Sequence, residues 1–117
     1  MAVNIPFMPC GKTIQIVTNA ATANNLTMTS DSPCQQYRIA NHASQPVYLW
    51  ISPIANPVTA VAPTGNGVKA QYTVCIPNGT VAVITGPQVS STAVVQVSAI
   101  AESGTPEVYI TPGEGMM

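Results

Sequence analysis

Hydrophobic and polar residues alternate along several short stretches of this chain, as they do in a β-strand with one buried face. The alternation is clear in residues 13–18 and 37–40. Residues 46–51 are apolar on both faces, so we expect one face to meet the core and the other to meet a partner or a covering loop. No stretch sustains the helical period, which predicts an all-β chain. The remaining expected strands are residues 26–30, 68–76, 80–85, 93–101 and 107–111.

Turn-forming residues separate these expected strands. Residues 65–67 (Gly-Asn-Gly) tolerate a positive φ, as a tight hairpin requires. Residues 77–80 place Pro where φ is preset and Gly where a left-handed conformation costs little. Residues 86–87 and 103–106 are expected to end two further strands. About eight short strands at this spacing indicate a sandwich or a barrel.

The length fits a single domain spanning residues 1–117. Residues 1–11 are expected to form an extended arm, which either packs on an adjacent subunit or frays. The longest expected loop, residues 52–68, carries three prolines and either lies over a neighbouring subunit or forms a solvated linker. A secretory signal is not expected, and no stretch approaches the ~20 apolar residues of a bilayer span, so we expect no membrane partner.

Charged side chains are scarce, with three Lys or Arg and four Asp or Glu making 6% of the chain, against roughly 25% in an ordinary domain. Charged surfaces keep monomers apart, and a net charge near zero promotes association. Three cations are too few to neutralise a phosphate track, which argues against nucleic acid, and too few for an amphipathic membrane helix. The composition therefore favours a structural or assembly role.

The residue types that carry chemistry are few. Cys10, Cys34 and Cys75 are odd in number and lack metal-ligand spacing, which favours buried or partly buried free thiols, with one bridge and a spare thiol as the alternative. His42 is the only histidine, so we expect no metal site, no cofactor and no Ser-His triad. The four acids fall in or beside expected loops, which favours solvated positions. We therefore expect a protein that is not an enzyme.

Aromatic and apolar residues supply the candidate interface. Tyr48 and Trp50 lie together in one expected strand, where aromatic pairs pack in a core or a subunit interface. Such a pair also stacks on sugars, so a carbohydrate-binding module stays open. Phe7 and Met8 of the expected arm complete the set of possible interface residues.

Three elements of the chain occur together in a familiar order. They are residues 37–42 leading into 45–50, a turn at 76–81, and an ending at 104–115 that contains Thr-Pro-Gly-Glu-Gly. In order and spacing they resemble the capsid cement or decoration proteins of tailed bacteriophages, particularly short-tailed ones. The similarity covers roughly residues 37–117, and its motifs are individually unspecific.

The resemblance implies a jelly-roll-like β-sandwich that binds the outside of the phage capsid and ties neighbouring major capsid subunits together. It implies the major capsid protein as partner, a homodimer or homotrimer with the dimer favoured, and no catalytic residues. The protein would then be made in the bacterial cytoplasm and reside on the exterior of the virion. Another phage component, such as a tail, head-fibre or adaptor protein, remains the alternative.

Overall fold

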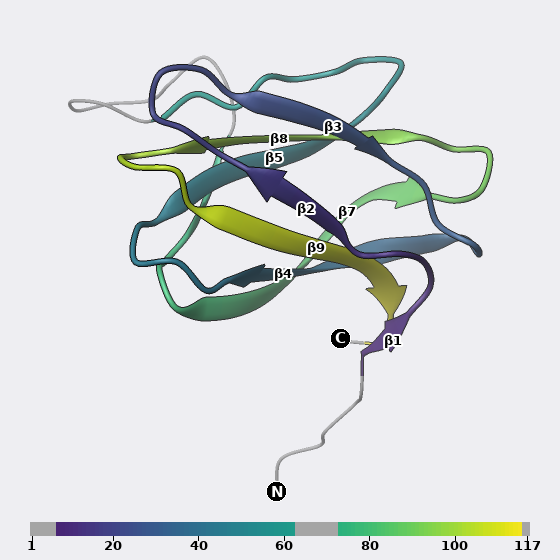
Figure 1. The fold of residues 1–117 in the computed structure, drawn as a ribbon. Helices are drawn as coiled ribbons and strands as arrows, with labels where there is room; N and C mark the ends of the chain where they lie inside the picture. The colour runs from purple at the N-terminus through teal and green to yellow at the C-terminus, as the bar shows by residue number, and fades with distance from the viewer. Residues whose placement is uncertain (1–6, 63–72, 116–117) are drawn as a thin grey trace, which may run out of the picture.

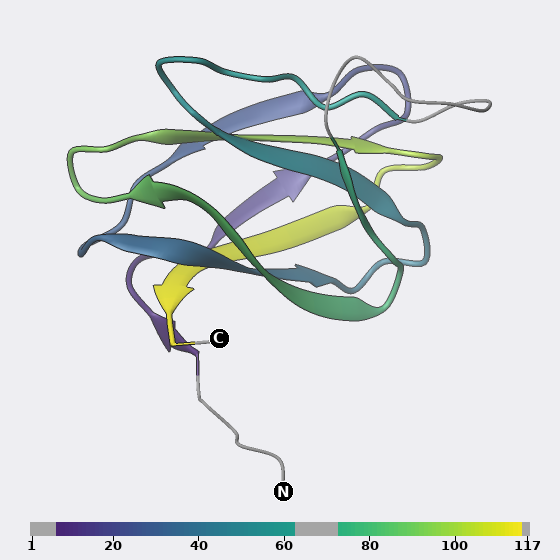
Figure 2. The ribbon, with the colours of Figure 1, turned by 180° about the vertical axis from the view of Figure 1, so that it is seen from behind.

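The structure is a computed structural model that describes residues 7–62 and 73–115. In these residues nine strands and no helix form two antiparallel sheets packed face to face (Figure 1), and Figure 2 shows the same layers from behind. The strands are β1 (Met8–Pro9), β2 (Ile14–Val17), β3 (Asn24–Met28), β4 (Cys34–Asn41), β5 (Val47–Pro53), β6 (Val74–Ile76), β7 (Thr80–Val89), β8 (Val95–Ala101) and β9 (Glu107–Glu114).

The strand pairs are nested: the innermost pair is formed by strands adjacent in the sequence, and each further pair encloses the one before it, as in one long antiparallel hairpin. β5 pairs with β6, β4 with β7, β3 with β8 and β2 with β9, all antiparallel. Two further pairings, β4 with β9 and β5 with β8, roll this hairpin into a first sheet, β2-β9-β4-β7, and a second sheet, β3-β8-β5-β6. β1 follows β2 along the same side of β9. This strand order is that of a jelly roll, so the expected all-β, jelly-roll-like sandwich is confirmed.

The period-2 pattern supplies the core between the sheets. Leu49 and Val47 of β5 face inward with no exposed surface, as do Tyr37 and Ile39 of β4. Full burial of one such aliphatic side chain stabilises the fold by about 1.5–3 kcal/mol. In the described residues every buried side-chain polar atom has a hydrogen-bond partner. The polar side-chain atoms buried in the described part of the sandwich therefore do not oppose folding by remaining unpaired.

Several expected strand ends differ from the structure: β3 is shifted by two residues, β4 begins three residues earlier, and β7 and β9 end later. β7 runs through Gly86 and Pro87 to Val89, and β9 continues past Thr111 to Glu114. Pro is tolerated in β7 because this strand lies at the edge of its sheet, where a missing N–H breaks no ladder. In β9 the partner changes from β2 to β1 close to Pro112, so its missing N–H also falls at a break. The turn expected at residues 65–67 lies outside the described residues, as does most of the strand expected at 68–76.

The segment after β5 covers part of the outer face of the second sheet, over β5 and β8. The Val58 N–H donates to Ser52 Oγ at 3.0 Å, and the Ala60 N–H donates to Ser98 Oγ at 2.8 Å. Ala60, Ser52 and Ser98 are all buried. The second face of β5 thus meets a covering loop, as one of the two sequence alternatives predicted. Ile54, Asn56 and Pro57 of this loop are exposed, as expected of a solvated segment, whereas Ser52 and Ser98 hold its middle against the sheet. That the loop also lies over a neighbouring subunit stays a prediction.

A buried phenol makes the fold sensitive to alkaline pH. The Tyr37 hydroxyl donates to the Pro87 carbonyl oxygen, and burial, followed by the Cys34 thiol, raises the Tyr37 pKa well above its usual value. Because the folded-state pKa is the higher one, this stability is fully present below about pH 10 and is lost as pH rises further. We expect urea denaturation to show the free energy of unfolding falling above about pH 10, by up to about 1.4 kcal/mol per pH unit from this group. Tyr37→Phe should make that decline shallower, and an unchanged slope would contradict the assignment.

Candidate interaction surfaces

The outer face of the first sheet is the uncovered sheet face within the described residues. Its side chains alternate with the buried ones along four strands and are exposed or half-buried. A single guanidinium and a single carboxylate are the charged groups among them. The side chains that form this face include Gln15 and Val17 of β2, Glu107, Tyr109 and Thr111 of β9, Arg38 of β4, and Val81, Val83 and Thr85 of β7.

Hydrogen bonds link the side chains of this face, one of them between two neutral hydroxyls and two of them to a carboxylate. The hydroxyls of Thr13 and Thr111 lie 2.6 Å apart. The Glu107 carboxylate accepts from the Gln15 side-chain amide at 2.8 Å and from the Tyr109 hydroxyl at 3.2 Å. Because these polar groups already hydrogen-bond to one another, a partner that covers this face would leave fewer donors and acceptors buried without a hydrogen bond. The face is suited to contact with another protein surface.

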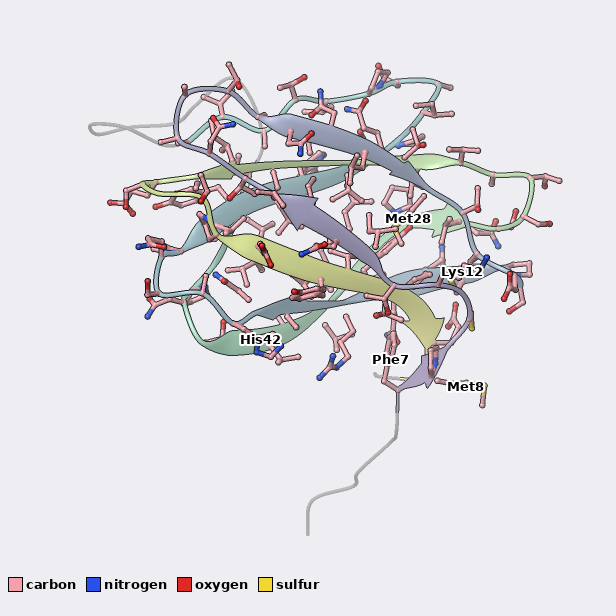
Figure 3. The ribbon with its side chains drawn as sticks, in the orientation of Figure 1. Phe7, Met8, Lys12, Met28 and His42 are labelled. Carbon is pink, nitrogen blue, oxygen red and sulfur yellow. The ribbon has the colours of Figure 1, made fainter. Side chains whose placement is uncertain are left out.

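The N-terminal segment reaches the end of the same sheet. β1 pairs with the end of β9, and the Cys10 N–H donates to the Pro112 carbonyl at 2.8 Å. The Phe7 ring lies where a side chain on Gly113 would stand, so only glycine fits there. Met8 is 67% exposed and points away from the sandwich (Figure 3). Phe7 and Met8 are therefore placed at one end of the first sheet.

Tyr48 and Trp50 lie on the outer side of β5, in the second sheet, so the four expected interface residues do not form one site. The Tyr48 hydroxyl donates to the Glu102 carboxylate at 3.1 Å, and burial together with this carboxylate raises the Tyr48 pKa. Trp50 lines an apolar hollow of about 140 Å³. β7 contributes Ile84 and Pro87 to the same hollow, at the side where the two sheets meet.

A second, polar hollow of about 520 Å³ lies between the turn after β4 and the turn before β9. His42 is exposed there, as expected of a turn histidine, and its ring centre is 6.0 Å from that of Tyr109. Glu107 and Gln45 complete the part of the hollow that could bind hydroxyl groups. Sequence reasoning missed Tyr109 and Glu107, although their two-residue spacing places both on the outer face of β9.

The three cysteines are free, and they differ in exposure. Cys34 is buried, Cys10 half-buried and Cys75 exposed, so the expectation of buried or partly buried thiols is wrong for Cys75. Burial is the main cause of the raised pKa of Cys34. Within residues 7–62 and 73–115, no group of three His, Cys, Asp or Glu side chains could hold a metal ion. The same residues contain no helix long and apolar enough to cross a membrane.

The fold and these surfaces define a class, a compact antiparallel jelly roll with one bare sheet face. No known family profile matches the chain. No curated protein matches it either. Among solved structures, the P-domain of Penaeus vannamei nodavirus is similar to it, with a TM-score of 0.44 and 12% identity over 89% of this chain and 97% of that domain. A likeness of this size carries no inference, and the jelly-roll assignment rests on strand order.

Proposed function

We propose that this chain is a viral structural protein, a cement or decoration protein of a phage capsid that binds the outer shell and joins neighbouring major capsid subunits. One observation above all supports this role. The jelly roll covers part of the outer face of its second sheet with its own loop, whereas the described residues leave the outer face of its first sheet, which carries one guanidinium and one carboxylate, bare. Jelly rolls are a common architecture of viral capsid domains, and the resemblance of residues 37–117 to phage cement proteins points the same way.

The physical basis of attachment is neutral contact. With seven charged side chains in the whole chain, affinity has to come from buried apolar area, at ~25 cal/mol per Å², and from neutral hydrogen bonds. Each contact can be modest, because contacts to several subunits of one lattice raise the effective affinity. Cementing is the mechanical result, since a molecule that touches two capsid subunits opposes their separation.

Salt dependence tests this mode of binding. We expect the occupancy of purified shells, measured by co-sedimentation, to change less than about twofold between roughly 0.05 and 1 M NaCl, because Coulomb attraction between exposed charges is screened by salt and contributes little here. A steep fall in occupancy with added salt would show that ionic contacts carry the attachment and would contradict the mechanism.

The polar hollow supports a second candidate, a carbohydrate-binding module. Tyr109 and His42 offer two ring faces, and Glu107 and Gln45 offer groups that bind hydroxyls. A glycan array would test this, with Tyr109→Ala expected to abolish binding and Trp50→Ala, on the other sheet, expected to preserve it. An array without any ligand, together with shell binding, leaves the cement role. A tail, head-fibre or adaptor protein would instead assemble into rings or tubes in isolation.

A further inference from the structure

β7 presents an unprotected edge. It is the longest strand of the described residues, with ten residues, and it ends the first sheet, where it pairs with β4 alone. The N–H and C=O groups on its other side therefore have no partner strand. Natural edge strands are usually guarded by charges, bulges or prolines. Residues 80–86 (Thr-Val-Ala-Val-Ile-Thr-Gly) contain no charge and no proline, and residues 80–85 pair with β4 in regular register. The pairing with β4 becomes irregular between Thr85 and Val89, and Pro87 is the first residue that lacks an N–H.

We propose that residues 80–86 pair antiparallel with the same residues of a second copy of this chain, about a two-fold axis that passes midway between the two Val83 residues. Antiparallel pairing about a two-fold axis makes a strand its own complement. With Val83 opposite Val83, the paired segment begins at Thr80 and ends at Gly86, immediately before Pro87 interrupts the donors. The length of the unguarded edge thus selects this register.

The side chains of this register are compatible on both faces. On the inner face Ala82 lies opposite Ile84 of the second copy, so a small residue meets a large one, and Thr80 lies opposite Gly86. On the outer face Val81 lies opposite Thr85, both of which suit cross-strand contact. Because β7 has no charged residue, no like charges are brought together.

The apolar hollow beside β7 adds a reason to cover this edge. It is lined by Trp50 and Ile51 of β5 and Val74 of β6, together with Ile84 and Pro87. The inward-facing side chains of an added strand would lie over its mouth, with Thr80 of the second copy opposite Gly86. Burial of these apolar walls would add to the backbone hydrogen bonds that the edge supplies.

The geometry also sets the shape of the dimer. Residues opposite one another in an antiparallel pair point to the same face, so the outer faces of both first sheets lie on one side of a continuous sheet. The dimer would present two copies of the bare face side by side. This inference rests on the proposed function in one respect, because a dimer with two binding faces can contact two capsid subunits at once. The dimer itself requires no capsid shell to form.

Sedimentation of the purified chain tests the proposal. We expect the wild-type protein to be a dimer at micromolar concentration. Val83→Lys places two like charges opposite each other at the axis and should raise the dimer dissociation constant at least 100-fold. Val17→Lys, which makes the same substitution on the outer face at the opposite edge of the same sheet, is the control and should remain a dimer. A monomeric wild type, or a Val83→Lys dimer as tight as the wild type, would overturn the proposal.

A cross-link tests the register, and it decides the case if Val83→Lys fails to fold. In a Cys75→Ser background, Val83→Cys with oxidised glutathione should form a disulfide between two copies, with the two thiols oxidised and glutathione reduced. Val17→Cys should stay monomeric on a non-reducing gel, and equal cross-linking of both would overturn the register. A dimer that does not bind capsid shells would contradict the proposed function but not this inference. A monomer that binds capsid shells would contradict this inference but not the proposed function.

Discussion

Replacing Asn41 with Ala is expected to lower the free energy of unfolding by about 3–5 kcal/mol. Asn41 has no exposed surface, and its amide nitrogen donates to the carbonyl of Gln45 at 3.0 Å and to that of Ile76 at 3.1 Å. Its side-chain oxygen accepts from the Ala43 N–H at 3.1 Å. One side chain thus joins the turn after β4 to the end of β6, across the two sheets. Alanine would leave these backbone groups buried and unpaired.

Chemical denaturation measures the effect, and Asn25→Ala provides the matched control. Asn25 is exposed on β3, so its replacement should change the free energy of unfolding by less than about 0.5 kcal/mol. Equal losses in the two variants would mean that the Asn41 bonds contribute little beyond what an exposed asparagine contributes. The linkage between the two turns would then be wrong as an account of how the sheets are held together.

Replacing Tyr109 with Ala is expected to weaken binding to the capsid shell at least 30-fold, or about 2 kcal/mol, as truncation of a central interface aromatic commonly does. Tyr109 lies opposite Ala40 in the middle of the first sheet and is half-buried by its own neighbours. Its ring is the largest side chain on the bare face, so it supplies much of the area a partner can bury. Quantitative binding to purified shells would measure the loss.

The matched control is Tyr48→Ala, which removes the same side chain from the outer side of the second sheet. Tyr48 is also half-buried and hydrogen-bonds a carboxylate, as Tyr109 does. We expect its replacement to leave shell binding within about threefold of the wild type. A larger loss from Tyr48→Ala than from Tyr109→Ala would assign attachment to the other sheet.

Local patterns were sufficient to predict most strands, since alternation over residues 13–18 and 37–40 depends only on which side chains face the core. The pairing of β4 with both β7 and β9 is non-local, and no pattern within a strand specifies it. The jelly-roll expectation came from resemblance for that reason. The strand ends at Pro87 and Pro112 were misjudged because a proline is tolerated where a strand lies at an edge or changes its partner.

The interaction surfaces were harder to predict. The aromatic pair Tyr48 and Trp50 indicates a contact surface. Residues 54–62, however, cover part of the outer face of the same sheet, and Ser52 and Ser98 within the strands hold that loop in place. Polar residues inside otherwise apolar strands were the available signal. The bare face around Tyr109 becomes a candidate only when the other sheet is known to be covered.

Cryo-electron microscopy of the virions that, under the proposed function, carry this chain tests the central claim most directly. We expect jelly-roll density on the outside of the shell, at junctions between major capsid subunits, with the sheet that contains Tyr109 turned toward the shell. Density confined to the tail, or virions that lack the chain altogether, would contradict the claim that this charge-poor protein is a capsid cement.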